Sequence, residues 1–321
     1  MKKVLESVLT IIFIIILFIS CGPAKSKKAA KDYTVGFVQM GYKSSWRSAE
    51  TDSIRDTARE REIKLIYIDA QNKQELQIKA LRNFIANSID GIILVPIIKT
   101  GWDRVLIEAR DAGIPVVLID RGITVSDDSL YTTLIKSDFV LQGIKAGKWL
   151  SRKLNYTGNI VELKGTEDLS SAINRKRGFE SIIKKYPGIK IIKSESADFK
   201  ESKGKEIMKK FLIAEGKNID ALFAHNDEMA IGAIKAIEEY GLRPGLDIII
   251  ISIDGIRKAF EAMIQGKLNC TVECNPLFGP AAFNALARAI AGEKLPKWIK
   301  QDDKVFPQEI ADEIFPTRTY Y

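Results

Sequence analysis

The side chains best suited to chemistry in this chain are polar and aromatic residues that follow strongly apolar runs. Asp120 and Arg121, for example, come directly after the apolar run 115–119. Because ligands of open parallel sheets bind beyond the carboxyl ends of the strands, we expect such residues to face a common cleft. The residues that share this position are Lys43, Ser44, Ser45, Trp46, Arg47, Asp120, Arg121, Arg175, Phe199, Asn226 and Asp254.

This mixture of groups suits a small molecule that carries several hydroxyl groups. Carboxylates accept hydrogen bonds, a guanidinium donates two in a planar fork, and an amide does both. The apolar face of a sugar ring packs on an aromatic plane, which Trp46 and Phe199 are placed to supply. The set therefore predicts a sugar-binding cleft.

Each of these residues also has a purely structural interpretation. Trp46 fits the core face of a first helix, and Arg175 fits a solvated helix surface. Asp227 and Asp254 fit helix caps, a common use of aspartate, and Phe199 fits ordinary packing. The shared position at strand ends favours binding for the set as a whole.

The sequence lacks the usual signatures of catalysis. His225 is its only histidine, which excludes a metal site built on several histidines. It contains no Gly-Lys-Ser/Thr phosphate loop and no G-x-S-x-G elbow, and the loop 41–46 lacks the glycines of a dinucleotide fingerprint. We expect a non-enzyme without metal or cofactor, and we interpret His225 as a satisfied strand-end residue.

Alternating apolar runs and amphipathic segments predict the fold class. The Val- and Ile-rich runs are typical of buried parallel strands. Between them lie helical segments such as 74–87, which places Ile78, Leu81, Phe84 and Ile85 on one face. Alternation at this spacing predicts an α/β protein with parallel sheets.

The chain after residue 32 is long for one such sheet, so we expect two Rossmann-like lobes joined by a three-strand hinge. The extended pieces 131–138, 268–274 and 304–307 have no place in the strand–helix repeat and are predicted to build that hinge. We expect an N-terminal lobe from 33–135 plus 275–303 and a C-terminal lobe from 136–274 plus 304–321.

The first 32 residues indicate export and anchoring. Lys2 and Lys3 precede an apolar stretch that is too short to span a bilayer comfortably, which is typical of a signal peptide over residues 1–20. Cys21 then follows a small residue, Ser20, as in the lipobox of bacterial lipoproteins. Residues 21–32 are predicted to form a lipidated tether, with an ordinary signal peptide or an uncleaved anchor as the alternatives.

Charge and the remaining cysteines are uninformative about function. The formal net charge is +8, but four lysines of that excess lie in the tether, so the chain carries no sign of nucleic-acid binding. Cys270 and Cys274 lie in one predicted strand, with their Cα atoms about 13 Å apart. That separation is too large for a disulfide, and we expect free thiols.

The motifs together resemble a known family. The stretches that carry the resemblance are SSWRSAET, QNKQELQIKALRNFIA, TGWDRVLIEARDAGIPVVLIDR, SAINRKRGF, SADFKESKGKE, AHNDEMAIGAIKAI and ISIDG, which span most of residues 33–290. The chain is similar to type I periplasmic sugar-binding proteins of the ribose-binding family. Trp46-Arg47 and the TGW at 100–102 resemble its galactofuranose-binding branch, whereas ribose binders carry Phe-Phe at the first position.

The resemblance implies a role for each site residue. Trp46 would stack on the sugar ring, Phe199 would close its other face, and Lys43, Ser44 and Ser45 would lie on the same loop as Trp46. Cys274 stands where ribose binders carry a ligand-binding Gln, which leaves the identity of the sugar open. The residues that would bond hydroxyls are Arg47, Asp120, Arg121, Arg175, Asn226 and Asp254.

The resemblance also implies partners and location. We expect an exported, lipid-anchored monomer on the periplasmic or extracellular side, which closes around a monosaccharide and then docks on an ABC permease; a chemoreceptor is a further candidate partner. Three alternatives stay open. A sugar-metabolising α/β enzyme would turn its sugar over, a nucleoside-binding lipoprotein would bind nucleosides but not free sugars, and a transcription regulator would need a DNA-binding module where the signal segment stands.

Overall fold

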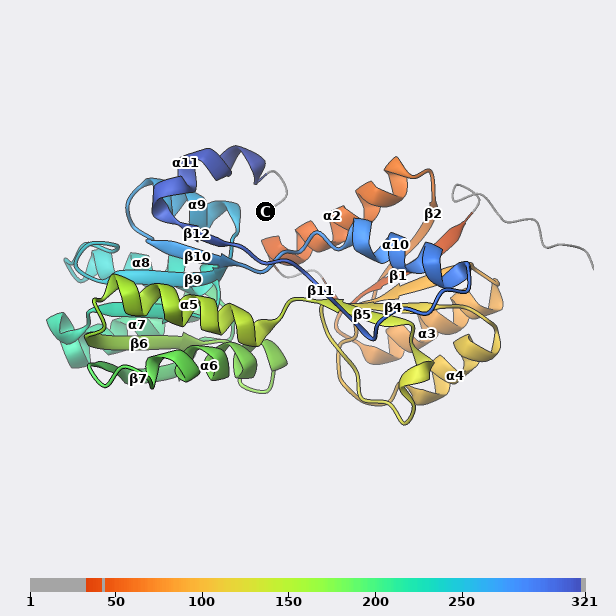
Figure 1. Ribbon diagram of the computed structural model, residues 1–321, viewed down its shortest axis with the longest axis horizontal. Helices are drawn as coiled ribbons and strands as arrows, with labels where there is room; N and C mark the ends of the chain where they lie inside the picture. The colour runs from red at the N-terminus through yellow and green to blue at the C-terminus, as the bar shows by residue number, and fades with distance from the viewer. Residues whose placement is uncertain (1–32, 42–43, 319–321) are drawn as a thin grey trace, which may run out of the picture.

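The computed structural model describes residues 33–41 and 44–318. Two lobes lie side by side, each built on a six-stranded sheet (Figure 1). The predicted signal peptide, the lipidation site Cys21, the tether and Lys43 lie outside the described residues.

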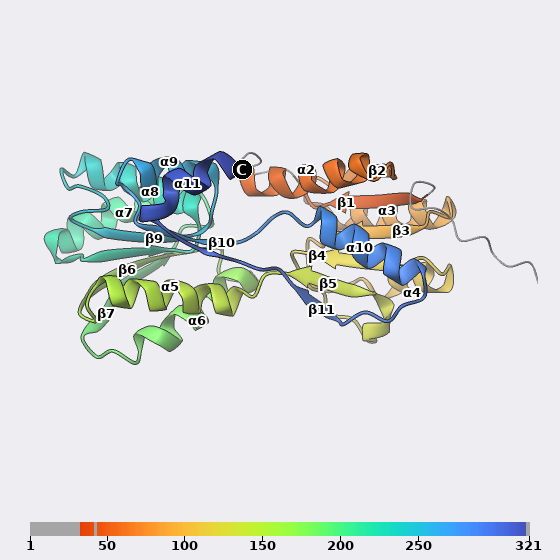
Figure 2. The same cartoon turned by 45° about the horizontal axis from the view of Figure 1, so that its top comes forward.

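The sheet of the N-terminal lobe is parallel throughout, in the order β11-β5-β4-β3-β1-β2. Helices α2 and α10 pack together on one face, while α3 and α4 pack together on the other (Figure 2). Its elements are β1 (Thr34–Gln39), α2 (Ser45–Glu60), β2 (Lys64–Asp69), α3 (Gln74–Ala86), β3 (Gly91–Leu94), α4 (Asp103–Asp111), β4 (Val116–Ile119), the 3-10 turn η2 (Asp128–Leu130), β5 (Thr133–Lys136), α10 (Gly279–Ile290) and β11 (Trp298–Lys300).

The sheet of the C-terminal lobe repeats this arrangement in the order β12-β10-β9-β8-β6-β7. Helices α5 and α6 pack on one face, and α7, α8 and α9 cover the other. Its elements are α5 (Phe139–Lys153), β6 (Gly158–Lys164), α6 (Ser170–Ile183), β7 (Ile189–Ser196), α7 (Glu201–Glu215), η3 (Gly216–Asn218), β8 (Ala221–Ala224), α8 (Asp227–Glu239), β9 (Ile249–Asp254), α9 (Arg257–Ile264), β10 (Cys270–Glu273), β12 (Val305–Pro307), η4 (Gln308–Ile310), α11 (Ala311–Ile314) and η5 (Phe315–Thr317).

The predicted α/β class with two parallel-sheet lobes is confirmed, with one exception in the pairing. The edge strand β12 runs antiparallel to β10, because the chain returns from the N-terminal lobe and enters this sheet from the opposite end. The helix predicted at 74–87 is α3, where Leu81 and Phe84 are buried and Ile78 and Ile85 are partly exposed. Cys270 and Cys274 are free and buried, as predicted.

Three segments carry the chain between the lobes, at 137–138, 274–278 and 301–304 (Figure 1). The first leads from β5 into α5, the second from β10 into α10, and the third from β11 into β12. Each lobe therefore completes one face of its sheet with a helix that arrives from the other lobe. Among the described residues, no helix is both long and apolar enough to cross a bilayer.

Candidate binding site between the lobes

A cavity of about 480 Å³ lies between the two lobes, at the carboxyl ends of their strands. Of the predicted site residues, Ser45 is an exposed residue at the start of α2 and is not part of the cavity wall. The predicted residues in that wall are Ser44, Trp46, Arg47, Asp120, Arg121, Arg175, Phe199, Asn226 and Asp254.

The N-terminal lobe presents a guanidinium held by two carboxylates. Arg47 on α2 donates to Glu50 (2.5 Å) and to Asp120 beyond β4 (2.8 Å). Gln39, at the end of β1, donates to the same Glu50 oxygen at 2.9 Å. Burial opposes the charge on Arg47, but Glu50 and Asp120 outweigh it and raise the pKa of Arg47. The guanidinium is therefore fixed and charged before any ligand arrives.

Arg121 lies next to this network and is less tightly held. Its Nε atom is 3.5 Å from Asp120, and its side chain remains 25% exposed. Asp120 thus orients Arg47 first and Arg121 second. The exposed fork of Arg121 is the guanidinium most available to a ligand in this lobe.

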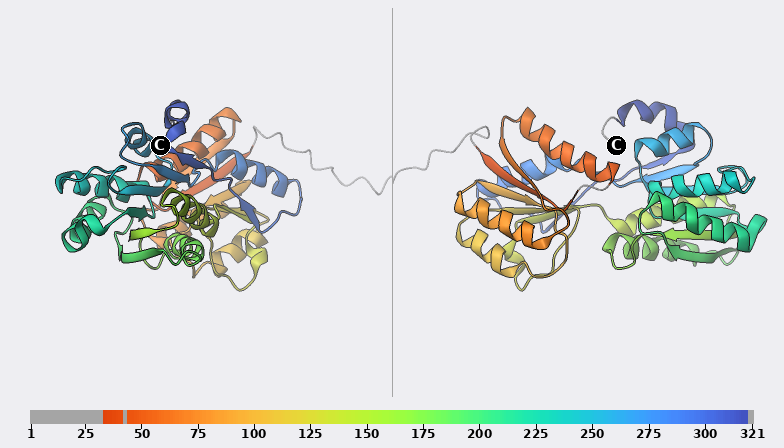
Figure 3. Two further views of the ribbon diagram at one scale, coloured as in Figure 1. Left: turned by 60° about the vertical axis from the view of Figure 1, so that its left-hand side comes forward. Right: turned by 180° about the vertical axis from the view of Figure 1, so that it is seen from behind.

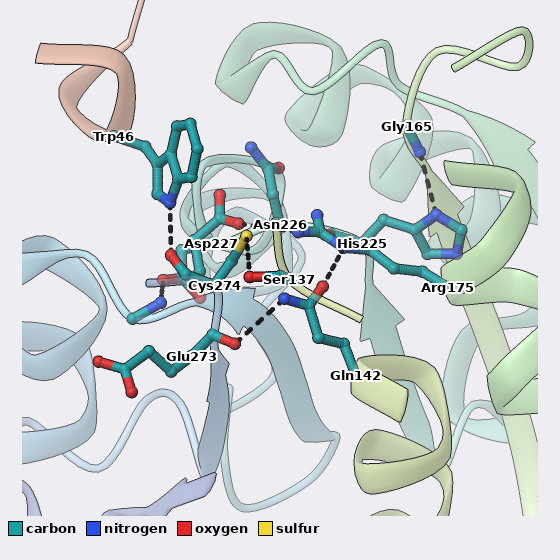
Figure 4. A network of polar contacts seen from close by, with 12 residues as sticks. Trp46, Ser137, Gln142, Gly165, Arg175, His225, Asn226, Asp227, Glu273 and Cys274 are labelled. Carbon is teal, nitrogen blue, oxygen red and sulfur yellow. Dashed lines mark hydrogen bonds and ion pairs between the residues drawn. The ribbon is translucent and has the colours of Figure 1, made fainter. Parts of the chain in front are cut away.

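The C-terminal lobe presents a second guanidinium in the same manner. Arg175 on α6 faces Asp254 at the end of β9 (3.3 Å) and donates to the backbone oxygen of His225 (2.6 Å) (Figure 4). Its side chain is only 4% exposed, so the surface interpretation of Arg175 is wrong. Burial raises the pKa of Asp254 well above its usual range, against the lowering effect of Arg175.

The two Arg–Asp pairs occupy equivalent places in the two lobes. Each arginine lies on the helix after the first strand of its sheet, and each aspartate lies at the end of the third strand from the edge β11 or β12. Asp120 and Asp254 also share a positive φ, of 64° and 133°. L-residues rarely adopt positive φ, so the surroundings must hold both carboxylates in place.

Buried neighbours fix the turn that carries Asp254. Asp227, at the start of α8, accepts the backbone N–H groups of Gly255 (2.6 Å) and Ile256 (2.8 Å) and the hydroxyl of Thr271 (2.8 Å). Asp227 is therefore structural, as one sequence alternative held. Its neighbour Asn226 caps α8 by accepting the N–H of Met229, while lining the cavity as predicted.

Trp46 is both a cavity wall and a core residue. Its indole N–H donates to the Cys274 carbonyl at 2.5 Å, and its ring meets Phe278 edge-on with centroids 6.2 Å apart. Only 8% of Trp46 is exposed. One face of Trp46 therefore packs inward, as the core interpretation expects, and the other borders the cavity.

Phe199 is presented from the opposite lobe by an unusual turn. Asp198 and Phe199 both have positive φ, and a Cβ atom at Gly165 would lie 1.9 Å from the Phe199 ring. The ring therefore lies directly against the glycine backbone. Gly165 in turn donates its N–H to Nδ1 of His225 at 3.3 Å, and Nε2 of His225 lies 3.0 Å from Glu162. His225 is completely buried and both of its ring nitrogens have hydrogen-bond partners, as the sequence suggested. It holds the Gly165 backbone on which the Phe199 ring lies.

Sequence reasoning missed several wall residues. Phe139, the first residue of α5, directly follows the segment 131–138 that was interpreted as a hinge, so its ring carried no strand-end signal. Glu228 follows the recognised pair Asn226-Asp227 and could have been found from that position. The remaining additions are Pro96, Ile97, Ile98, Lys99, Gly122, Asp168, Leu169, Ser170 and Ser171, together with Cys274, which had been noted only as a departure from ribose binders.

The charges around the cavity balance. Guanidinium and ammonium groups from both lobes face a similar number of carboxylates, including Asp168 and Glu228. Burial raises the pKa of Glu228, with Asp227 adding to the effect. Within residues 33–41 and 44–318, no group of His, Cys, Asp and Glu side chains could hold a metal ion. The arrangement favours an uncharged ligand with many hydroxyl groups.

Two sheets whose strand ends face one cavity, with the chain crossing three times between them, define a class of two-lobed binding proteins. A family described as the periplasmic binding protein domain matches residues 35–294, and the chain belongs to this family. The galactofuranose-binding protein YtfQ of Escherichia coli strain K12 is 50% identical over 266 residues, which are 82% of this chain and 84% of that protein.

Solved structures show the same similarity. The arabinose-binding component of an ABC transporter from Shewanella sp. ANA-3, bound to α- and β-L-arabinofuranose, is 47% identical with a TM-score of 0.83, over 89% of this chain and 95% of that one. The crystal structure of a galactofuranose-binding protein is 46% identical with a TM-score of 0.82, over 90% of this chain and 100% of that one.

Proposed function

We propose that this protein is the substrate-binding component of an ABC sugar importer and that it captures a monosaccharide in its furanose form. One observation carries the proposal: two equivalent Arg–Asp pairs and the aromatic residues Trp46, Phe139 and Phe199 enclose one charge-balanced cavity. Similarity to the Escherichia coli galactofuranose-binding protein and to the arabinofuranose complex supports the ring form.

The cavity suits a sugar from both sides. Trp46 comes from the N-terminal lobe, and Phe199 comes from the C-terminal lobe. Closure of the lobes would bring the two rings to opposite faces of one small ring, while the arginines and aspartates reach its hydroxyl groups. Such closure is a population shift driven by the higher affinity of the closed form.

The ring form can be tested with deoxy sugars that close in only one way. 5-Deoxygalactose can form a furanose but not a pyranose, and 4-deoxygalactose can form a pyranose but not a furanose. We expect titration calorimetry to detect 5-deoxygalactose and L-arabinose but not 4-deoxygalactose. Preference for 4-deoxygalactose would contradict the furanose proposal, and binding of nucleosides without any sugar would favour the nucleoside-binding alternative.

We propose further that the protein is exported and held to the membrane by lipid on Cys21, with residues 22–32 as tether. The family supports export, and the anchor rests on the residues around Cys21. Stable anchoring of this kind needs more than one acyl chain. Cys21→Ala should leave the precursor unprocessed or release a soluble protein, and a cleaved Cys21→Ala protein that stays in the membrane fraction would contradict the anchor.

The proposed partners follow from the same function. An ABC permease would receive the sugar, and a chemoreceptor is a second candidate for the closed form. We propose a monomer that carries no enzyme activity, so sugar recovered after incubation should be chemically unchanged. The lobe limits of 33–135 plus 275–303 and 136–274 plus 304–321 stay a proposal, supported by the membership of β11 and β12 in different sheets.

A further inference from the structure

We propose that Gln142 is a positioning residue that couples Arg175 to the hinge and thereby sets how readily the two lobes close. This inference rests on the proposed function. Gln142 lies on α5, is completely buried and is not part of the cavity wall, so it does not itself meet a ligand. Figure 4 shows its amide group between Arg175 and the strand that carries Glu273.

The hinge end of this connection is a single carboxylate. Asp303, in the third crossing segment, accepts the hydroxyl of Ser137 from the first crossing at 2.9 Å. The same Asp303 oxygen accepts the backbone N–H of Asn275, from the second crossing, at 3.1 Å. Its other oxygen accepts the amide N–H of Gln142 at 2.9 Å. One buried side chain thus ties all three crossings together, and Gln142 is bound to it.

The ligand end is equally specific. The amide oxygen of Gln142 accepts Nε of Arg175 at 2.9 Å, while the other guanidinium nitrogens reach His225 and Asp254. An amide has one accepting and one donating end, and here Arg175 needs the acceptor and Asp303 needs the donor. The orientation of Gln142 is therefore fixed. A movement of Arg175 toward a bound ligand has to be accommodated at the hinge.

The arginine of the N-terminal lobe has no hydrogen-bonded link to Asp303 among the described residues. Arg47 is held by Glu50 and Asp120, and Glu50 is held by Gln39, all within the same lobe. Glu50 is completely buried, and burial raises its pKa against the effect of Arg47. The two equivalent arginines thus differ in their link to the hinge. Arg175 is hydrogen-bonded through Gln142 to the carboxylate that all three crossings share, whereas Arg47 reaches one crossing by ring contact with Trp46, whose indole donates to Cys274.

Two variants at position 142 test the connection. Gln142→Met keeps the length of the side chain but removes its hydrogen bonds to Arg175, to Asp303 and to the backbone oxygen of Glu273. Gln142→Glu keeps an acceptor for Arg175 but places a carboxylate against Asp303. If Gln142 only held Arg175, the Glu variant would behave like the wild type. If it couples Arg175 to the hinge, both variants should lose ligand-induced closure.

The experiment uses the chain from Gly22 onward, with L-arabinose and 5-deoxygalactose as probes. Titration calorimetry gives the Kd, and small-angle X-ray scattering gives the radius of gyration with and without sugar. We expect Gln142→Met to weaken binding at least about tenfold, as for loss of a hydrogen bond to a charged group. We also expect the scattering of both variants with saturating sugar to stay closer to that of the open form.

Leu150→Ala is the matched control, because Leu150 is completely buried in the same helix and has no part in the network. It should lower the melting temperature while leaving the Kd and the sugar-induced change in scattering as in the wild type. Wild-type Kd and closure in Gln142→Met, or the same loss in Leu150→Ala, would overturn the inference. If the wild type binds neither sugar, the proposed function fails. The hinge link can still be tested on the empty variants, because loss of the link should change their radius of gyration. An unchanged radius of gyration would overturn the inference.

Discussion

Asp120 and Asp254 occupy backbone conformations that side-chain-bearing residues rarely adopt, and both face the cavity. Positive φ at such residues costs about 1–3 kcal/mol each and persists only where the surroundings hold it. The surroundings here are specific: Arg47 binds Asp120, and Arg175 with the turn fixed by Asp227 holds Asp254. Asp120 and Asp254 are therefore held in position in the cavity wall before a ligand binds.

Arg121 offers the clearest test of ligand geometry. Arg121→Lys keeps the charge but loses the planar fork, and it should weaken sugar binding by about 1.5–3 kcal/mol. The loss should depend little on salt, because the expected partner is a neutral hydroxyl. Titration calorimetry at low and high ionic strength measures both. Unchanged affinity would assign Arg121 to structure alone, and a steep salt dependence would indicate an anionic ligand.

Trp46 should matter for stability as well as for binding. Its ring borders the cavity but is also buried against Phe278. For Trp46→Ala we expect the free energy of unfolding to fall by about 3–5 kcal/mol, the usual range for truncating a buried tryptophan.

Sugar binding of Trp46→Ala should weaken by a further 1–3 kcal/mol or so, from the lost apolar surface. Trp46→Phe serves as the control, since it retains a ring but cannot donate to Cys274. Denaturant unfolding and calorimetry on both variants separate the two effects. A stable Trp46→Ala protein with normal affinity would contradict both roles.

Helices α5 and α6 approach so closely that their glycines become essential. A Cβ atom at Gly178 would lie 2.0 Å from the Val140 carbonyl oxygen, and one at Gly143 would lie 2.1 Å from that of Arg175. Because these atoms belong to backbone, the helices would have to separate. The close contact is also what brings Gln142 on α5 within hydrogen-bonding reach of Arg175 on α6.

Gly178→Ala should therefore destabilise the protein by about 1–3 kcal/mol, as overpacking does, and should also weaken sugar binding because α6 carries Arg175. Thermal unfolding and calorimetry check the two effects. Gly113→Ala is the control: its φ is +71° but no atom lies within 4 Å of the added Cβ. It should cost about 1 kcal/mol of backbone strain and leave affinity unchanged. Equal affinities in both variants would show that the spacing of α5 and α6 does not control the site.

Glu162 within β6 and His225 directly after β8 form a pH-sensitive pair. Burial lowers the pKa of His225 against the raising effect of Glu162, so the folded protein binds a proton less readily than the unfolded chain. The contribution of His225 to stability is therefore lost as pH falls below about 6.5. Burial also opposes ionisation of Glu162, but His225, Lys176 and Ser194 outweigh it and lower the pKa of Glu162 to about 2. Its contribution is lost in a separate window, below about pH 4.5.

Buried carboxylates elsewhere titrate in the same range, so the effect of His225 has to be measured as the difference in melting temperature between the wild type and His225→Gln. The melting temperature of the wild type minus that of His225→Gln should shrink as pH falls from about 7.5 to 5, and calorimetric scans at several pH values measure it. A difference that grows on acidification would mean that His225 is protonated in the folded state. The tautomer inferred from the N–H of Gly165, with the proton on Nε2, would then be wrong.

At the scale of the whole molecule, the sequence predicts the two lobes because apolar periodicity reports burial, and burial in parallel sheets is nearly continuous. It also places most of the cavity wall, since strand ends are local features. Sequence patterns did not identify Phe139, Gln142 and Asp303, for a physical reason. Phe139 begins a helix and does not follow a strand, while Gln142 and Asp303 meet across more than a hundred residues of sequence, and no local pattern marks such a meeting.

The three crossings determine how late in synthesis each lobe can finish folding. The sheet of the N-terminal lobe lacks its edge strand β11 and the covering helix α10 until residue 300 is available, although its first strand begins at residue 34. Neither lobe is a continuous stretch of chain, so neither can finish folding early during synthesis, and pairings this distant form slowly. The topology that places a cleft between two lobes thus also delays the completion of both lobes until nearly the whole chain has been made.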